Sequence, residues 1–223
     1  MTARLVKAAG EIAADGIWAW LPGHREPSAR RPGLLLDRDG VILEFVPYLS
    51  RPDDVRLLPG ASETIAAANR HGLPVAVVTN QSGIGRGYYS WDDLCAVLER
   101  MQALLAEGGA HVDAVFACPH HPDARPPFAH ADHPGRKPNP GMLERAATAL
   151  QIDLACSWLV GDTLSDAQAG LAAGLAGTVH VLTGLGREER SAVRRLRESG
   201  QPVRLAEGIG DLLDLLPLLG DRP

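Results

Sequence analysis

The sequence predicts an α/β fold, a doubly wound parallel sheet of the Rossmann-like type, from three observations. Short apolar runs of strand type alternate with longer segments that carry alanine and leucine at helical spacing. Several of the helical segments are closed by glycine, which is typical of a helix C-terminus. Polar and acidic residues follow three of the apolar runs directly. Strands that alternate with helices of this length imply parallel strands joined by helical crossovers.

The expected elements follow one another along the chain. Residues 1–20 have the pattern of a short amphipathic helix, and residues 21–33 are rich in proline, glycine and arginine, as a linker would be. We therefore expect an N-terminal extension and linker over residues 1–32 and one main domain over residues 33–223. Within that domain, strands are expected at residues 34–36, 75–79, 112–117, 157–161 and 178–182, and helices at residues 61–72, 92–109, 140–151 and 165–174.

The bulk composition favours a single domain that acts on a small molecule. The chain has 223 residues, 45% of them hydrophobic, which is enough for one domain with a sizeable core. Its formal net charge is −5, and no block of like charges stands out. This pattern argues against a dedicated nucleic-acid or membrane surface. We expect a small-molecule partner and a monomeric protein.

The same sequence predicts a soluble, cytoplasmic protein. The three cysteines, Cys95, Cys118 and Cys156, share no CxxC spacing and do not suggest a disulfide framework. Glu11 and Asp15 interrupt the apolar run that a signal peptide would need. No apolar stretch is long enough to cross a bilayer as a helix.

Candidate functional residues lie where the predicted strands end. The run at 34–36 leads into Asp37, the run at 75–79 into Thr79, Asn80, Gln81 and Ser82, and the run at 157–161 into Asp162. Parallel sheets bind ligands beyond the carboxyl ends of their strands, so these side chains are expected in one crevice. Lys137 comes just before a predicted helix that would aim it toward the same place.

The acidic residues suggest metal-assisted phosphoryl chemistry. Positions two apart at a strand end point the same way, so Asp37 and Asp39 would share the crevice while Arg38 turns aside, and Gly40 would let the chain turn sharply behind them. Asp162 adds a third oxygen donor, and an all-oxygen cluster favours Mg²⁺. One carboxylate would be free to attack phosphorus, while the other protonates the leaving oxygen and later activates water.

Three further residues complete the predicted chemistry. The hydroxyl of Thr79, with the backbone N–H groups that follow it, would bind phosphate oxygens, and Lys137 would neutralise the charge that develops on them. Asp166, four residues after Asp162, would orient the lysine or metal-bound waters.

Four motifs in order resemble those of the haloacid dehalogenase superfamily of phosphatases: DRDG at 37–40, a strand ending in TN at 79–80, a single lysine before proline at 137, and GD-x-x-x-D at 161–166. The match spans residues 34 to 185. The resemblance implies that Asp37 is the nucleophile and Asp39 the general acid and base. It also implies that a metal is held by Asp37, by the backbone carbonyl of Asp39 and by Asp162. Each motif alone has a plainer reading, such as a surface turn or a helix cap, but their order favours the phosphatase.

Two longer segments, TNQSGIGRG (79–87) and CPHHP through RKPNPGM (118–142), look like one branch of that superfamily. The branch contains D-glycero-D-manno-heptose-1,7-bisphosphate 7-phosphatases and histidinol-phosphate phosphatases, and its members have no large cap domain. The resemblance implies removal of the 7-phosphate of a heptose bisphosphate, with histidinol phosphate or another small phosphomonoester as the alternative. The residues expected to bind substrate are Asn80, Gln81, Ser82, Arg86 and Arg136. A non-catalytic binding protein on the same fold is the alternative of another class.

The sequence departs from that branch in two places. Where the heptose enzymes carry a polar loop resembling N-x-D-x-G-Y, this chain keeps only the tyrosine, as Tyr48, and has Leu43, Phe45 and Pro47 at the other positions. Either the sugar specificity differs or the stretch merely packs.

The second departure concerns a structural zinc that the branch holds through Cys-x-His and Cys-x-Cys. Cys118 and His120 match the first pair, but His133 and Gly135 take the places of the second. A tetrahedral zinc needs four donors. His121, His130 or Asp132 would have to fill in, and a solvated histidine-rich loop is the expected outcome.

Overall fold

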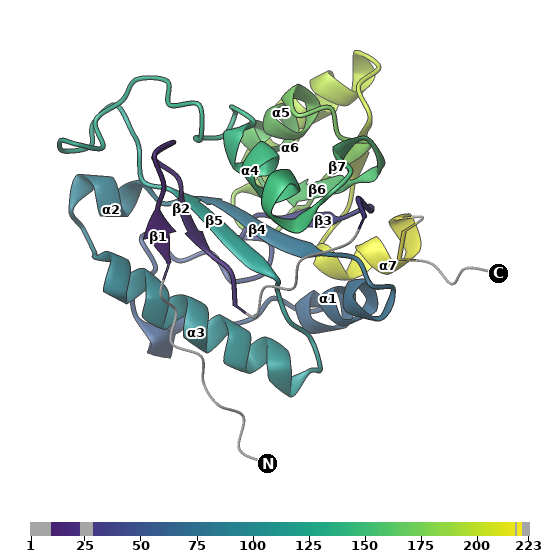
Figure 1. Cartoon of the computed structure of the whole chain (residues 1–223). Helices are drawn as coiled ribbons and strands as arrows, with labels where there is room; N and C mark the ends of the chain where they lie inside the picture. Colours follow the sequence, from purple (N-terminus) through teal and green to yellow (C-terminus); the bar gives the residue numbers. More distant parts are fainter. Residues whose placement is uncertain (1–9, 23–28, 217, 220–223) are drawn as a thin grey trace.

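The computed structural model describes residues 10–22, 29–216 and 218–219. Within them the chain forms an eight-stranded sheet in the order β1-β2-β5-β4-β3-β6-β7-β8 (Figure 1). The six strands from β5 to β8 in that order run parallel, and β1 and β2 form an antiparallel edge. The predicted parallel sheet is confirmed. No second globular unit interrupts the described chain, as expected for a phosphatase without a large cap.

The strands are β1 (Glu11–Ile12), β2 (Trp18–Trp20), β3 (Leu34–Leu36), β4 (Val75–Asn80), β5 (Ala114–Cys118), β6 (Trp158–Gly161), β7 (Gly177–His180) and β8 (Val203–Leu205). The α-helices are α1 (Ala61–Arg70), α2 (Ser82–Arg86), α3 (Trp91–Glu107), α4 (Gly141–Leu150), α5 (Leu164–Ala172), α6 (Gly186–Glu198) and α7 (Leu212–Leu215). All five expected strands and all four expected helices are present with boundaries shifted by a few residues.

Helices cover both faces of the sheet, so alternate side chains of the strands enter two separate cores. Leu34 and Leu36 of β3 pack with residues of α1, α3 and α7 on one face. Leu35, between them, packs with residues of α4 on the other face. Figure 1 shows the same division, with α1 and α3 below the sheet and α4 and α5 above it. Burial on both faces explains why these strands are continuous apolar runs.

The N-terminal segment differs from its prediction. Residues 1–9 lie outside the described residues, but over residues 10–20 the predicted helix is wrong, because the chain forms the β1–β2 hairpin. Trp18 and Trp20 are buried and flank the half-buried Ala19, which is the period of a strand. β2 pairs with β5, and Trp18 stacks on Trp91 of α3 with ring centroids 5.4 Å apart. The described strands of the expected extension thus belong to the same sheet.

The turn of this hairpin lies against the loop that follows β5. Asp15 forms an ion pair of 2.7 Å with Arg145 of α4. Gly16, at a φ of +74°, lies so close to the rings of His120 and His133 that an added Cβ would be 2.7 Å from the first and 2.8 Å from the second. The hairpin therefore covers the histidine-rich loop from one side.

The linker prediction can be compared with the structure only in part, since residues 23–28 lie outside the described residues. Among the described helices, none combines the length and the apolar character that crossing a bilayer requires. All three cysteines are free thiols.

Candidate active site

The carboxyl ends of three adjacent parallel strands bring the predicted residues together. β3 lies between β4 and β6, in register with both. Asp37 follows β3, Thr79 and Asn80 end β4, and Asp162 follows β6. Because the strands are parallel, these residues meet at one edge of the sheet, as the sequence predicted.

Lys137 lies at the centre of this edge and is 3% exposed. Its Nζ atom is 3.0 Å from Oδ1 of Asp37 and 2.6 Å from Oδ1 of Asp166. It also donates a hydrogen bond of 2.8 Å to the carbonyl oxygen of Val78. Burial alone would lower the pKa of Lys137, but the two carboxylates outweigh burial and raise it. The ammonium group is therefore a fixed positive charge beside Asp37.

Asp37, Asp162 and Asp166 form a cluster in which one oxygen from each lies within 4.8 Å of the others. Burial raises the pKa of Asp37 to about 7, although Lys137 opposes the shift. Burial and the charge of Asp37 raise the pKa of Asp162 to about 8. The one ammonium of Lys137 does not neutralise three carboxylates, two of them buried, so the cluster favours either protons or a cation. Its donors are all oxygen, which fits Mg²⁺.

Gly40 makes room for Asp162. Gly40 has a φ of +79°, and a Cβ there would lie 2.3 Å from Oδ2 of Asp162. The same oxygen accepts a hydrogen bond of 2.8 Å from the backbone N–H of Leu185. The sharp turn predicted at Gly40 is confirmed, and the absence of a side chain lets two loops close around the carboxylate.

Arg38 contradicts its prediction. Instead of turning aside from the crevice, its side chain lies beside Asp39 and is 1% exposed. Its guanidinium donates from Nε and Nη2 to both carboxylate oxygens of Asp39, at 2.8–3.2 Å. The strand rule fails here because the chain leaves the strand geometry at the turn that ends in Gly40. The side chain of Asp39 is paired with Arg38 and is not part of the cluster of Asp37, Asp162 and Asp166.

Gln81 connects Asp39 to the end of β4. Its Nε2 donates to Oδ2 of Asp39 at 3.1 Å and to Oγ1 of Thr79 at 2.8 Å. Its Oε1 accepts from Arg38 and from the hydroxyl of Tyr89. Arg38 and Tyr89 are thus site residues that the sequence reasoning missed, and no local pattern marked Tyr89.

The side chain of Asn80 fixes the backbone of Lys137. Its amide nitrogen donates to the carbonyl of Lys137 and its amide oxygen accepts from the N–H of the same residue, both at 3.1 Å. The lysine backbone is therefore fixed to the end of β4, which leaves the Asn80 side chain little capacity for substrate. Ser82 begins α2 at the crevice.

The two arginines that were expected to bind substrate both lie near His121. Nη2 of Arg86 lies 3.0 Å from Nδ1 and 2.9 Å from Nε2 of His121, and 3.4 Å from Oδ2 of Asp123. Nη1 of Arg136 donates to the carbonyl of His120 at 3.2 Å. Burial lowers the pKa of His121, and the nearby charges of Arg136 and Arg86 lower it further. These residues form a cationic cluster beside the crevice.

A cavity of about 280 Å³ lies beside Asp39 and the end of β4. Its lining residues are Arg38, Asp39, Phe45, Val46, Pro47, Tyr48, Leu49, Asn80, Gln81, Ser82, Gly83 and Tyr89. Of the three residues at which the sequence departs from the heptose enzymes in this loop, Leu43 is fully buried and packs in the core. Phe45, Pro47 and Tyr48 instead line the cavity, where they would meet a substrate.

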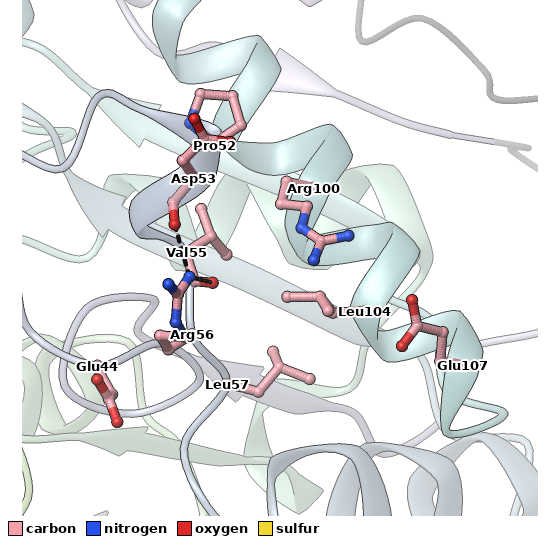
Figure 2. Close-up of a pocket in the computed structure, with 9 residues that line it drawn as sticks. All are labelled: Glu44, Pro52, Asp53, Val55, Arg56, Leu57, Arg100, Leu104 and Glu107. Atoms are coloured by element: carbon pink, nitrogen blue, oxygen red, sulfur yellow. Dashed lines mark hydrogen bonds between the residues drawn. The ribbon is translucent and has the colours of Figure 1, made fainter.

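A second recess, of about 600 Å³, is lined by residues of the segment 52–57 and of α3 (Figure 2). Its lining residues are Glu44, Pro52, Asp53, Val55, Arg56, Leu57, Arg100, Leu104 and Glu107. Figure 2 shows the guanidinium of Arg56 turned back onto the carbonyl oxygens of Asp53 and Val55. Carboxylates outnumber free guanidinium groups here, so the recess is not suited to a phosphate ester.

The residues at the expected zinc positions lie close together. The rings of His120 and His133 are stacked with centroids 3.6 Å apart, and Sγ of Cys118 is 3.8 Å from Nδ1 of His133. At the fourth position, an added Cβ on Gly135 would lie 2.6 Å from Cγ1 of Ile17. Ile17, which belongs to the N-terminal hairpin and is buried, therefore occupies the space that a fourth ligand side chain would enter.

Comparison with known sequences shows the family of the chain. A family model described as HAD-hydrolase-like matches residues 135–212. The D-glycero-beta-D-manno-heptose-1,7-bisphosphate 7-phosphatase of Mesorhizobium japonicum is 45% identical over 209 residues, which are 94% of this chain and 93% of that protein.

Solved structures give the same result. A candidate HAD-like phosphatase from Mesorhizobium loti is similar with a TM-score of 0.81 at 40% identity, and the match covers 96% of this chain and 99% of that chain. The D,D-heptose 1,7-bisphosphate phosphatase of B. bronchiseptica, solved with magnesium and phosphate, gives a TM-score of 0.70 at 34% identity, over 83% of this chain and 98% of that chain. The similarity thus extends over nearly the whole length of these proteins.

Proposed function

Because the chain belongs to the HAD-like phosphatase family, we propose that its crevice hydrolyses the 7-phosphate of D-glycero-D-manno-heptose 1,7-bisphosphate. The enzyme is a phosphatase, and Asp37 is its nucleophile. One observation carries this proposal. A buried ammonium group, that of Lys137, holds the carboxylate of Asp37 at the end of a central strand, 3.0 Å away, beside two further buried aspartates.

In the first half of the reaction, a carboxylate oxygen of Asp37 attacks phosphorus and the bond from phosphorus to the sugar oxygen breaks. Asp39 gives a proton to that oxygen, so the sugar leaves as an alcohol and Asp37 carries the phosphoryl group. Lys137 and the hydroxyl of Thr79 stabilise the charge on the phosphoryl oxygens. Asp39 must leave its pair with Arg38 to reach the leaving oxygen, because its carboxylate is held there at 2.8 Å.

In the second half, water attacks phosphorus and Asp39 accepts a proton from that water. The bond between phosphorus and the Asp37 oxygen breaks, which releases inorganic phosphate, restores the carboxylate of Asp37 and leaves Asp39 protonated for the next cycle. Gln81 contacts both Asp39 and Thr79, so it keeps the proton carrier next to the phosphate-binding hydroxyl.

The residues present fit a magnesium ion. Asp37 and Asp162 would hold it with their side chains and Asp39 with its backbone carbonyl, while Asp166 remains paired with Lys137. When bound, the ion would neutralise carboxylate and phosphate oxygens that otherwise repel one another.

The second phosphate of the substrate accounts for the cationic cluster. The charges of Arg86 and Arg136 both lie near enough to His121 to lower its pKa. Arg86 also donates a hydrogen bond to the hydroxyl of Tyr48, which lines the cavity. A guanidinium group binds phosphate through two parallel hydrogen bonds. With a monophosphate held at Asp37, and among the described residues, Arg86 would keep only the exposed Asp123 as an anionic partner, and Arg136 would keep only the carbonyl of His120 as an acceptor.

Phosphate release from a panel of substrates tests the proposal. The panel contains heptose 1,7-bisphosphate, heptose 7-phosphate, another sugar bisphosphate and histidinol phosphate. We expect the highest kcat/KM with the heptose bisphosphate and heptose 1-phosphate as the product, identified by phosphorus NMR. Replacement of Arg86 and Arg136 by alanine should reduce kcat/KM about a hundredfold or more for the bisphosphate, and much less for the monophosphate.

The exposed Arg51 provides the matched control for this experiment, since its one ion pair among the described residues is with Asp54, at 3.9 Å on the surface. Arg51→Ala should leave the substrate ratio unchanged. A wild-type enzyme with no preference for the bisphosphate would contradict the assignment of the substrate. A higher kcat/KM for histidinol phosphate would replace it with the alternative of the same enzyme class.

A further inference from the structure

Tyr48 occupies a backbone conformation that tyrosine rarely adopts. The N–H of Leu49 donates to the carbonyl of Val46 at 3.1 Å, which closes a turn with Pro47 in its second position and Tyr48 in its third. Tyr48 has a φ of +54°. A positive φ at the third position defines a type II turn, where glycine is the usual residue. A bulky side chain there carries backbone strain, and strain of this kind is retained mainly at functional sites.

The turn directs the ring of Tyr48 over the start of α2. An added Cβ on Gly83 would lie 2.8 Å from Cδ1 of Tyr48, so the ring packs directly on the backbone of α2. The ring also meets Tyr88 edge to face, with centroids 4.7 Å apart. Although these contacts fix its position, Tyr48 remains 46% exposed and lines the cavity at the catalytic residues.

The hydroxyl of Tyr48 reaches Arg86. Nη1 of Arg86 donates to this hydroxyl at 3.3 Å, and Nη2 is held by His121. Arg86 lies three and four residues after Gly83 and Ser82, which line the cavity, so it projects from the same side of α2. Tyr48 on one side and His121 on the other therefore keep the guanidinium at the edge of the cavity. Tyr88 also hydrogen-bonds Arg86, from outside the cavity lining.

We propose that Tyr48 is a specificity-determining residue, which holds Arg86 in position for the second phosphate of the substrate. The role rests on the proposed bisphosphate substrate and adds to it a group that orders the arginine before binding. An ordered guanidinium loses less conformational freedom when phosphate arrives, so the advantage should appear as tighter binding of the bisphosphate.

Tyr48→Phe tests this role, because it removes the hydroxyl and keeps the ring that packs on Gly83. We expect the ratio of kcat/KM for heptose 1,7-bisphosphate to kcat/KM for heptose 7-phosphate to fall about three- to tenfold. The loss should appear in KM for the bisphosphate, with kcat retained. In the Arg86→Ala background the same substitution should change the ratio less than about twofold, because the group it positions is already gone.

The outcomes separate this inference from the proposed function. A wild-type enzyme without bisphosphate preference overturns both. A wild-type preference that Arg86→Ala removes, together with a Tyr48→Phe variant that matches the wild type, overturns the role of Tyr48 alone. An equal loss on both substrates, or an undiminished loss in the Arg86→Ala background, also overturns it, since the hydroxyl would then contact the sugar directly.

A second pair of variants tests the strain. Tyr48→Gly and Tyr48→Ala both remove the ring, but only glycine adopts the positive φ without strain. We expect Tyr48→Gly to have the higher Tm of the two, although glycine ordinarily lowers stability relative to alanine. The opposite order would show that the turn relaxes and that no strain is held at Tyr48.

Discussion

The ammonium group of Lys137 lies 2.6 Å from Oδ1 of Asp166, and both side chains are only 2% exposed. Removing one member of such a buried pair leaves the other charge uncompensated. We expect Asp166→Asn to lower the free energy of unfolding by about 3 to 5 kcal/mol. It should also lower kcat, because Lys137 would then bind Asp37 alone and hold the nucleophile more tightly. Urea denaturation and steady-state kinetics measure the two effects.

Asp54 supplies the control for that substitution. It pairs with Arg51 at the surface, where ion pairs contribute little. Asp54→Asn should match the wild type in stability and kcat. An Asp166→Asn variant as stable as Asp54→Asn would mean that Lys137 does not depend on this partner.

The stabilisation by Mg²⁺ should increase with pH. In the metal-free protein the pKa of Asp37 is raised to about 7 and that of Asp162 to about 8, mainly by burial. An aspartate in the unfolded chain titrates near pH 4, so across this window the folded state holds protons that the unfolded state has released. The contribution of these two groups to stability is full below about pH 4 and is lost as the pH rises through about 8.

Mg²⁺ needs the ionised carboxylates and competes with those protons. We therefore expect the rise in Tm on adding Mg²⁺ to be larger at pH 8 than at pH 6, with EDTA restoring the lower value at both. Thermal unfolding at the two pH values gives the comparison. A shift that is equal at both, or smaller at pH 8, would be inconsistent with a metal at these carboxylates.

The purified protein should contain well under one zinc ion per chain. Ile17 fills the space next to Gly135, so a fourth ligand has no room at that position. Burial raises the pKa of the Cys118 thiol to about 11, which disfavours the thiolate that zinc requires. Cys118→Ser should therefore change Tm little. Elemental analysis checks the first expectation, and stoichiometric zinc lost together with thermal stability in Cys118→Ser would contradict both.

If no zinc holds the histidine-rich loop, the N-terminal hairpin is the element that does. Gly16→Ala would place a methyl group against His120 and His133, whereas Gly72, which also has a positive φ, has nothing within 4 Å of an added Cβ. Both substitutions carry the same backbone strain, so their difference measures the contact alone. We expect Gly16→Ala to be less stable than Gly72→Ala by about 1 to 3 kcal/mol, the usual cost of overpacking. Equal stabilities would show that the hairpin yields without cost.

The sequence was sufficient for the central strands and for the position of the site. Apolar runs such as residues 75–79 are buried on both faces, which makes them recognisable without an alignment. The rule that ligands bind beyond the carboxyl ends of parallel strands then located Asp37, Thr79 and Asp162.

Features that depend on contacts distant in the sequence were not predictable. The hairpin at residues 10–20 is stabilised by pairing with β5 and by the stacking of Trp18 on Trp91, and neither partner is visible in the local pattern. Arg38 is buried because Asp39 pairs with its charge and Gln81, from another strand end, accepts a further hydrogen bond from it. Tertiary contacts determine the conformation of residues 10–20 and the burial of Arg38, whereas local periodicity is enough to identify the central strands.

The kcat of Asp37→Asn is the most direct test of the whole account. The amide is almost isosteric with the carboxylate but cannot attack phosphorus, so the variant should fold, with a Tm close to that of the wild type. Its kcat on the heptose bisphosphate should fall at least about a thousandfold, and no phosphorylated enzyme should accumulate. A folded Asp37→Asn variant that retains near wild-type kcat would show that Asp37 is not the nucleophile.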